Sequence, residues 1–111
     1  MDTVRIDYSS QGFIQLPDLP ENLNELLCHK NFLFSLPELP ENLIELECAR
    51  NVIISLPDLP KNLIELSCWA NRLTSLPKLP GTLIQLGCGH NELTSLPKLP
   101  KTLTYFECKS N

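Results

Sequence analysis

Residues 43–62 read LIELECARNVIISLPDLPKN, and the same pattern of leucine, cysteine, asparagine, serine and proline returns at 63–82 and at 83–102. This repetition decides the fold. Leucines and paired prolines recur at the same spacing, and so do two ladders of other residues. The ladders are Cys28, Cys48, Cys68, Cys88 and Cys108, and Asn31, Asn51, Asn71, Asn91 and Asn111. A fixed twenty-residue register predicts a solenoid, in which each turn buries its apolar face only against its neighbours.

Each repeat predicts a short strand followed by an extended return. Leu46 and Cys48 alternate with Glu45 and Glu47, which is the period of a strand with one buried face. The L-P-x-L-P segment that follows cannot be helical, because its prolines lack donors and push the preceding residues toward extended geometry. We therefore expect parallel strands stacked about 4.8 Å apart, with polyproline-like returns and little or no helix.

The composition excludes several classes of protein. A chain of 111 residues allows a single domain, and a hydrophobic share of 42% is too high for a wholly disordered chain. No apolar run approaches the roughly 18 residues that a membrane span needs. The net charge of −4 argues against nucleic-acid binding, which requires a basic face. We therefore expect neither a membrane nor a nucleic acid as partner.

The unit L-x-x-L-x-C-x-x-N-x-[LI]-x-S-L-P-x-L-P-x-[NT] resembles the shortest, bacterial type of leucine-rich repeat. The resemblance covers residues 16–111, with a truncated last repeat, and extends degenerately into residues 3–15. We expect one domain, in which 1–15 form a degenerate N-terminal repeat or cap and 16–111 form the tandem repeats. The resemblance implies strands on the concave face and returns on the convex face.

Some bacterial effectors with this repeat carry N-terminal helices and a separate ubiquitin-ligase domain, whose catalytic cysteine lies in a C-x-D motif. Here Cys108 belongs to the repeat ladder and is followed by Lys109 and Ser110, so the resemblance implies the repeat region without the ligase domain. The two histidines, His29 and His90, lie three turns apart and cannot share a metal ion or a nucleophile. We expect no enzyme activity and no cofactor.

Both ladders are interpreted as structural. The cysteines lack the close C-x-x-C pairs of zinc sites and occupy an inward position that leucine normally fills. Five free thiols predict a reducing compartment. No signal peptide is recognised after Met1, so we expect a cytoplasmic protein, or one delivered into a host cytosol without a signal peptide. The asparagine side chains are expected to satisfy backbone groups where each strand ends.

The outward positions of the strands differ from turn to turn, whereas the inward leucines barely change. This contrast predicts that the strand face binds a protein partner. An acidic patch on this face favours a partner with basic groups, although a solvated, solubilising face is an equal alternative. Tryptophan, which is enriched in binding hot spots, is the expected anchor. The predicted partner-binding residues are Glu45, Glu47, Glu65, Trp69 and Gln85, with Arg50 and Tyr105 at the rim.

Trp69 has the small residues Ala49 and Gly89 as neighbours in its column. Its ring either stands beside a shallow notch and binds, or folds over the gaps and covers the sheet. A second candidate surface lies at the edge where the chain leaves the strands, where apolar residues become polar in later turns. This predicted docking edge consists of Phe32, Phe34, Val52 and Ile54, joined by Ile14. Its alternative role is to seal the N-terminal end.

Charge is polarised along the chain, because residues 1–60 carry net −7 and residues 61–111 carry net +3. On the return side, the acids at positions 18, 38 and 58 give way to Lys78 and Lys98. Such a dipole favours head-to-tail stacking, although repeat duplication also explains it. The last strand is expected to leave Leu103 and Phe106 uncovered, so a homo-oligomer through the C-terminal end is an alternative. The alternative functions are thus a self-assembling structural protein and the recognition module of a ligase or effector system.

Overall fold

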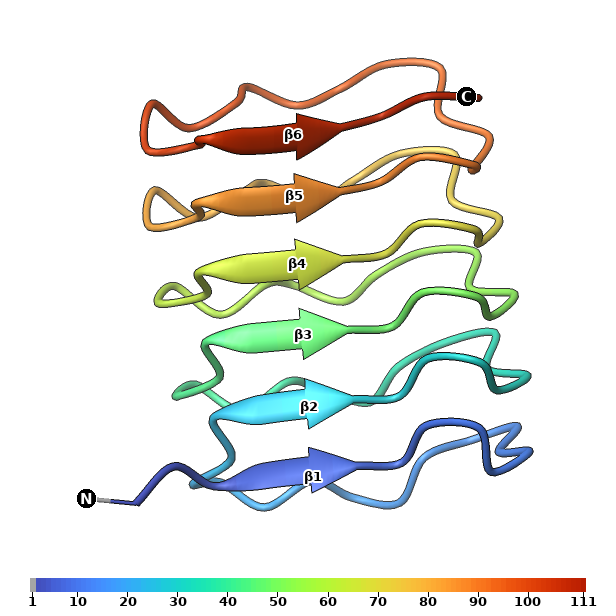
Figure 1. The fold of residues 1–111 in the computed structure, drawn as a ribbon, viewed down its shortest axis with the longest axis vertical. Helices are drawn as coiled ribbons and strands as arrows, with labels where there is room; N and C mark the ends of the chain where they lie inside the picture. The colour runs from blue at the N-terminus through green and yellow to red at the C-terminus, as the bar shows by residue number, and fades with distance from the viewer. Residues whose placement is uncertain (1) are drawn as a thin grey trace.

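The computed structural model describes residues 2–111 and confirms a parallel β-solenoid of about five turns. Six strands form one sheet in the order of the sequence, and Figure 1 shows the returns passing behind it. Residues 2–111 contain no helix, and therefore none that could cross a membrane. The strands are β1 (Arg5–Asp7), β2 (Glu25–Leu27), β3 (Glu45–Glu47), β4 (Glu65–Ser67), β5 (Gln85–Gly87) and β6 (Tyr105–Glu107).

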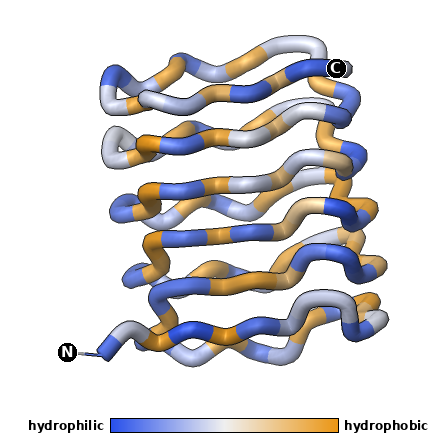
Figure 2. Tube along the Cα trace, viewed as in Figure 1, coloured by the Kyte–Doolittle hydropathy of each residue, from blue (hydrophilic) through white to orange (hydrophobic). Residues whose placement is uncertain are grey.

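The register of the sheet follows the repeat without a slip. Each residue pairs with the residue twenty positions later, so Glu45 lies beside Glu65 and Leu46 beside Leu66. Residues at equivalent positions therefore form straight columns across the sheet. Figure 2 shows the consequence, because hydrophobic and hydrophilic segments recur at similar places in successive turns. A slip of one residue would place the leucine column in solvent.

The core is a stack of leucine and cysteine layers between the strands and the returns. The central strand residues Leu26, Leu46, Leu66 and Leu86 are at most 2% exposed. Cys28, Cys48, Cys68 and Cys88 are fully buried, as the inward position predicts, and all five cysteines are free. Leu103, Phe106 and Cys108 pack against this core but are only partly buried.

The second proline of each return sets the turn back into the next strand. The carbonyl of Pro40 accepts a hydrogen bond from the amide of Leu43 at 3.2 Å, and the same turn recurs in every repeat. Proline suits this position because the turn requires its carbonyl group but not an N–H donor. The first turn is built from different side chains. There Tyr8 and Phe13 pack edge to face, with ring centroids 5.3 Å apart.

The asparagine ladder satisfies the backbone where each strand ends. The Asn51 side chain donates to the carbonyls of Cys28 at 3.0 Å and Cys48 at 3.1 Å, and its Oδ1 accepts from the amide of Leu33 at 3.0 Å. Asn71 and Asn91 repeat this pattern. Each amide therefore joins two consecutive turns, which confirms its structural interpretation.

The residue before each ladder asparagine, and before Gln11 at the equivalent position of the first turn, has a left-handed backbone conformation. These residues are Ser10, Lys30, Arg50, Ala70, His90 and Ser110, with φ between 53° and 63°. This geometry aims the Arg50 amide at the Trp69 carbonyl, 3.0 Å away, and the Ala70 amide at the Gly89 carbonyl, 2.9 Å away. Left-handed geometry costs roughly 1–2 kcal/mol for a residue other than glycine. The hydrogen bonds between turns therefore hold a strained column in place.

Candidate functional site

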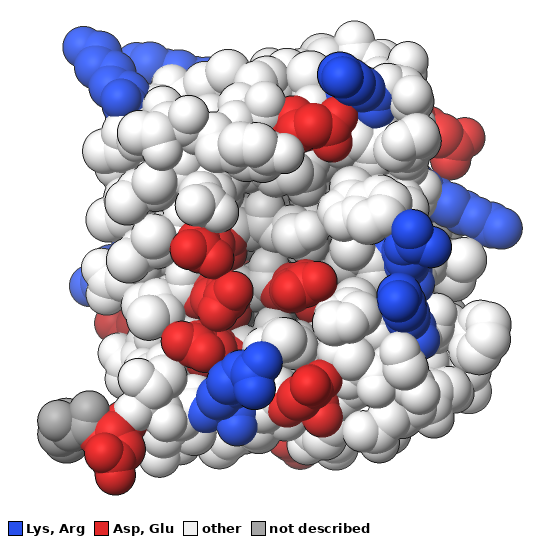
Figure 3. All heavy atoms as spheres, in the orientation of Figure 1, with Lys and Arg blue, Asp and Glu red and all other residues white. Residues whose placement is uncertain are grey.

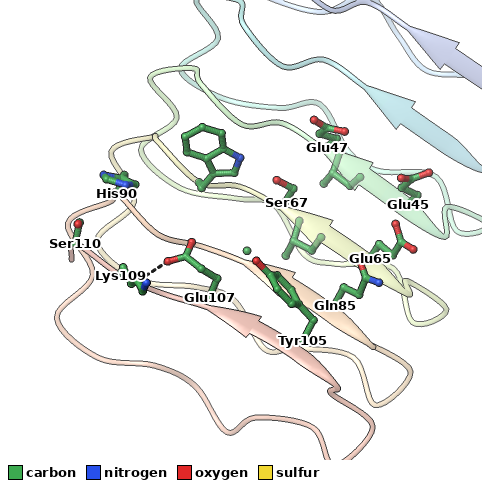
Figure 4. Close-up of a pocket in the computed structure, with 14 residues that line it drawn as sticks. Glu45, Glu47, Glu65, Ser67, Gln85, His90, Tyr105, Glu107, Lys109 and Ser110 are labelled. Carbon is green, nitrogen blue, oxygen red and sulfur yellow. Dashed lines mark hydrogen bonds between the residues drawn. The ribbon is translucent and has the colours of Figure 1, made fainter.

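The strand face contains a shallow, open depression of about 640 Å³. Six of the seven predicted partner-binding residues line it, and Figure 4 shows how five of them lie on β3 to β6. Because the columns run straight across the sheet, residues twenty positions apart in sequence become direct neighbours. The six are Glu45, Glu47, Glu65, Trp69, Gln85 and Tyr105. Their binding role stays a prediction.

An acidic column forms one side of the depression. Glu25, Glu45 and Glu65 lie at paired positions of β2, β3 and β4, and Figure 3 shows the acidic side chains gathered on this part of the face. Burial raises the pKa of Glu45, and the charge of Glu65 raises it further. Like charges at directly opposed positions destabilise the sheet. A cation placed between them would remove that cost.

The acids differ in whether a basic side chain lies beside them. Arg5 Nε lies 3.6 Å from Glu25 Oε1, and His29 Nδ1 lies 3.3 Å from Glu47 Oε1. Glu45 and Glu65 have no ion-pair partner among the residues that the structure describes. The middle of the acidic column is thus where an incoming cation would find uncompensated carboxylates.

Trp69 is partly buried and is held between residues of two neighbouring turns. The guanidinium carbon of Arg50 lies 4.7 Å from the ring centroid, and the His90 ring lies 6.2 Å away at 59°. Arg50 therefore covers the tryptophan rather than lining the depression. The neighbouring small residues are both buried, and Ala49 is only 2% exposed. The notch predicted beside the ring is therefore not open surface.

Sequence reasoning placed the other lining residues in columns but did not select them. One side chain, Glu107, has a specific structural role, because its Oε1 accepts a hydrogen bond from the Lys109 amide at 2.7 Å. A Cβ atom on Gly89 would lie only 2.6 Å from the Glu107 carboxylate. The glycine therefore makes room for this carboxylate, a relation that neither residue signals alone. The remaining polar lining residues are Ser67, His90, Lys109 and Ser110.

The predicted docking edge is exposed at most of its positions. Ile14, Phe32, Phe34 and Ile54 are 68%, 64%, 55% and 59% exposed, whereas Val52 is partly buried. The amide of Ile54 donates to the carbonyl of Phe34 at 3.3 Å, so these residues lie on adjacent turns. Side chains this exposed seal little core. The docking role of the edge stays a prediction.

The structure brings a serine, a histidine and a carboxylate together, but not in a catalytic arrangement. Ser9 Oγ lies 3.0 Å from His29 Nδ1, and Glu47 approaches the same nitrogen. A histidine that acts as a general base uses one ring nitrogen to accept the proton of the nucleophile and the other to bond the acid that orients the ring. Here one nitrogen faces both groups. No cluster of three or more metal-ligating side chains occurs within residues 2–111.

The buried thiols are kept in their protonated, poorly reactive form. Burial raises the pKa of Cys28 to about 12 and that of Cys88 to about 11, and it also raises the pKa values of Cys48 and Cys68. The thiolate is the reactive form of cysteine, so these side chains act as small hydrophobic groups.

No model of a protein family matches the sequence, and no curated protein matches it. Solved structures do. The leucine-rich repeat domain of a Shigella effector superimposes with a TM-score of 0.94 at 34% identity, over 96% of this chain and 49% of that one. YopM from Yersinia enterocolitica gives a TM-score of 0.65 at 36% identity, over 86% of this chain and 26% of that one.

YopM from Yersinia pestis, described as a leucine-rich effector protein, gives a TM-score of 0.63 at 25% identity, over 92% of this chain and 41% of that one. The chain thus spans less than half the length of each of these structures. The fold and the site define the class, a leucine-rich repeat solenoid with repeats of the bacterial type. Its structural neighbours are bacterial effector leucine-rich repeat domains, which confirms the resemblance predicted from the sequence.

Proposed function

We propose that this solenoid is a non-enzymatic recognition module that binds a protein segment rich in lysine or arginine on its strand face. The leucine-rich repeat fold of its neighbours is typically non-enzymatic and is consistent with protein interaction. The observation that carries the proposal is the pair Glu45 and Glu65. They lie side by side in the depression without a cation of their own.

The remaining residues of the depression support the same proposal. Gln85 follows Glu65 in the same column and offers both a donor and an acceptor to a peptide backbone. Tyr105 follows Gln85 and is 55% exposed, so it presents a ring and a hydroxyl group. Aromatic groups near the centre of a patch commonly contribute most of the binding energy. Trp69 would act as such an anchor, already fixed by Arg50.

Binding of a labelled arginine-rich peptide, followed by fluorescence anisotropy at low salt, tests this function. We expect the double variant Glu45→Gln with Glu65→Gln to weaken binding by about tenfold, because each lost charge-assisted contact is worth roughly 0.2–1 kcal/mol when exposed and more when half-buried. The matched control is Glu21→Gln with Glu92→Gln, which removes two exposed charges outside the depression. Equal weakening by both variants would mean that only net charge matters.

We further propose that the module acts in a reducing compartment, either the cytoplasm of its own cell or a host cytosol, because all five cysteines are free. The similarity to effectors favours the second setting, in which the module could also supply recognition to a ligase or effector system. Thiol labelling of protein taken directly from cells tests the compartment. Recovery of disulfide-linked species would count against it.

A further inference from the structure

The return face, formed by the L-P-x-L-P segments behind the sheet, carries charge that changes sign midway along the solenoid. Two columns of exposed residues show this change. The first column reads Asp18, Glu38, Asp58, Lys78 and Lys98. The second reads Glu21, Glu41, Lys61, Gly81 and Lys101. Both columns are acidic in the early turns and basic in the later ones. The sign of the charge changes between positions 58 and 78 in the first column and between positions 41 and 61, one turn earlier, in the second.

Each half of this face also contains a hollow with proline and leucine in its lining. The acidic half has a hollow of about 650 Å³, whose lining includes Pro37, Leu39 and Glu38. The basic half has one of about 400 Å³, whose lining includes Pro77, Leu79 and Lys78. The two halves thus share the same proline and leucine lining and differ mainly in the charge at the rim. The two charge columns, rather than the hollows, make the two halves of the face complementary.

We propose that two copies of this chain associate through their return faces, with their solenoid axes antiparallel. The two copies are related by a two-fold axis that runs parallel to the strands. This axis passes between the third return (56–60) and the fourth (76–80). It reverses the order of the turns in the second copy and keeps each column opposite the same column of the first copy. Asp58 then faces Lys78, Glu38 faces Lys98, and Glu41 faces Lys101, each pair occurring twice. If the two solenoid axes were parallel instead, residues of the same turn would face each other and bring like charges together.

The size of the face suits such a contact. The molecule extends 34 × 30 × 18 Å, and the return face spans the two longer dimensions. This is more than the roughly 800 Å² per partner that a standard interface buries. Exposed ion pairs contribute little individually, so the dimer is weak and sensitive to salt. Both strand faces point outward, so the dimer goes beyond the proposed function and presents two depressions.

Sedimentation equilibrium over a concentration series tests the dimer. We expect the wild-type chain to dimerise at about 0.01 M salt and to be monomeric at about 1 M, where the Debye length falls from about 30 Å to about 3 Å. A basic variant, Glu38→Lys with Asp58→Lys, and an acidic variant, Lys78→Glu with Lys98→Glu, each give positions 38, 58, 78 and 98 of the first column charges of one sign. Each alone should dimerise at least about tenfold more weakly than wild type.

An equimolar mixture of the two variants should restore association, because opposite faces then meet. The charge-matched control for the basic variant is Glu47→Lys with Glu65→Lys on the strand face, which should dimerise like wild type. A wild-type chain that stays monomeric at low salt would overturn the proposal. So would a variant that self-associates as strongly as wild type, or a mixture that stays monomeric. Binding of the arginine-rich peptide is measured separately on the strand face, so failure of one proposal leaves the other standing.

Discussion

The guanidinium carbon of Arg50 lies 4.7 Å from the centroid of the Trp69 ring, so a residue that follows β3 covers the tryptophan that follows β4. The His90 ring approaches from the next turn, 6.2 Å away. A ring held from two sides loses less conformational freedom when a partner binds. The repeat register brings positions 50, 69 and 90 to the same end of the strands, and the directions of the side chains then bring the three groups into contact.

We expect Glu45→Gln to stabilise the fold at neutral pH. Burial and the charge of Glu65 raise the pKa of the Glu45 carboxyl group above its ordinary 4.5. The native state therefore binds this proton more tightly than the unfolded chain does, and stability falls as pH rises through the raised pKa. The variant should raise the free energy of unfolding by about 0.5 kcal/mol at neutral pH. Urea denaturation at several pH values measures it.

The gain from Glu45→Gln should disappear below pH 4.5, where the wild-type carboxyl group is protonated in both states. The control is Glu38→Gln, which neutralises an exposed acid on the return side. It should change the free energy of unfolding by no more than about 0.5 kcal/mol. A Glu45→Gln variant that is less stable than wild type at neutral pH would show that the acidic column is not strained.

We expect Asn51→Ala to lower the free energy of unfolding by about 3 kcal/mol, because it strips partners from two buried carbonyls and one buried amide. Asn62→Ala provides the matched comparison, since Asn62 is exposed at a return turn. Its effect should stay within about 0.5 kcal/mol. Chemical denaturation of both variants decides the matter, and similar losses would refute the ladder's structural role.

Ala70 offers a test of the left-handed column, because its φ is 57°. Ala70→Gly should raise the free energy of unfolding by about 0.5–1 kcal/mol, since relief of the left-handed strain exceeds the entropy cost of glycine. Ala70→Val should lower it, because a β-branched residue tolerates this conformation least. Thermal unfolding of the pair gives the sign. If the valine variant were the more stable one, backbone strain would not govern this column.

The thiols should separate into two classes in the native protein. Cys108 is partly exposed, whereas the other four cysteines are fully buried and burial raises their pKa values. We expect N-ethylmaleimide to modify Cys108 first and the others only as the chain unfolds. Peptide mass spectrometry over a time course reads this directly. Modification of Cys48 as fast as Cys108 would contradict the buried ladder.

The fold and the alignment of the site were accessible from the sequence for one physical reason. Because every turn has the same length, the residue beside Glu45 must be Glu65, whatever the side chains do. Burial of the cysteine and asparagine ladders follows from the same argument. The period thus predicts which residues are neighbours across the sheet.

The rest of the site depends on interactions that the period does not encode. Lys30, Arg50 and Ala70 give no signal of a left-handed backbone, because glycine or asparagine would normally occupy such positions. The stacking of Arg50 on Trp69 depends on side-chain directions from two different columns. Likewise, the need for glycine at position 89 is explained by the Glu107 carboxylate and the Lys109 carbonyl that fill the space above it.

The most direct test of the central claim uses the single tryptophan of the chain as its own reporter. The indole N–H of Trp69 gives one resonance in a ¹H–¹⁵N spectrum, which can be followed while an arginine-rich peptide is added at low salt. Recognition on the strand face predicts a saturable shift of this resonance, lost in the Glu45→Gln, Glu65→Gln variant and kept in the Glu21→Gln, Glu92→Gln variant. Peptide binding that leaves the Trp69 resonance unmoved would contradict the account.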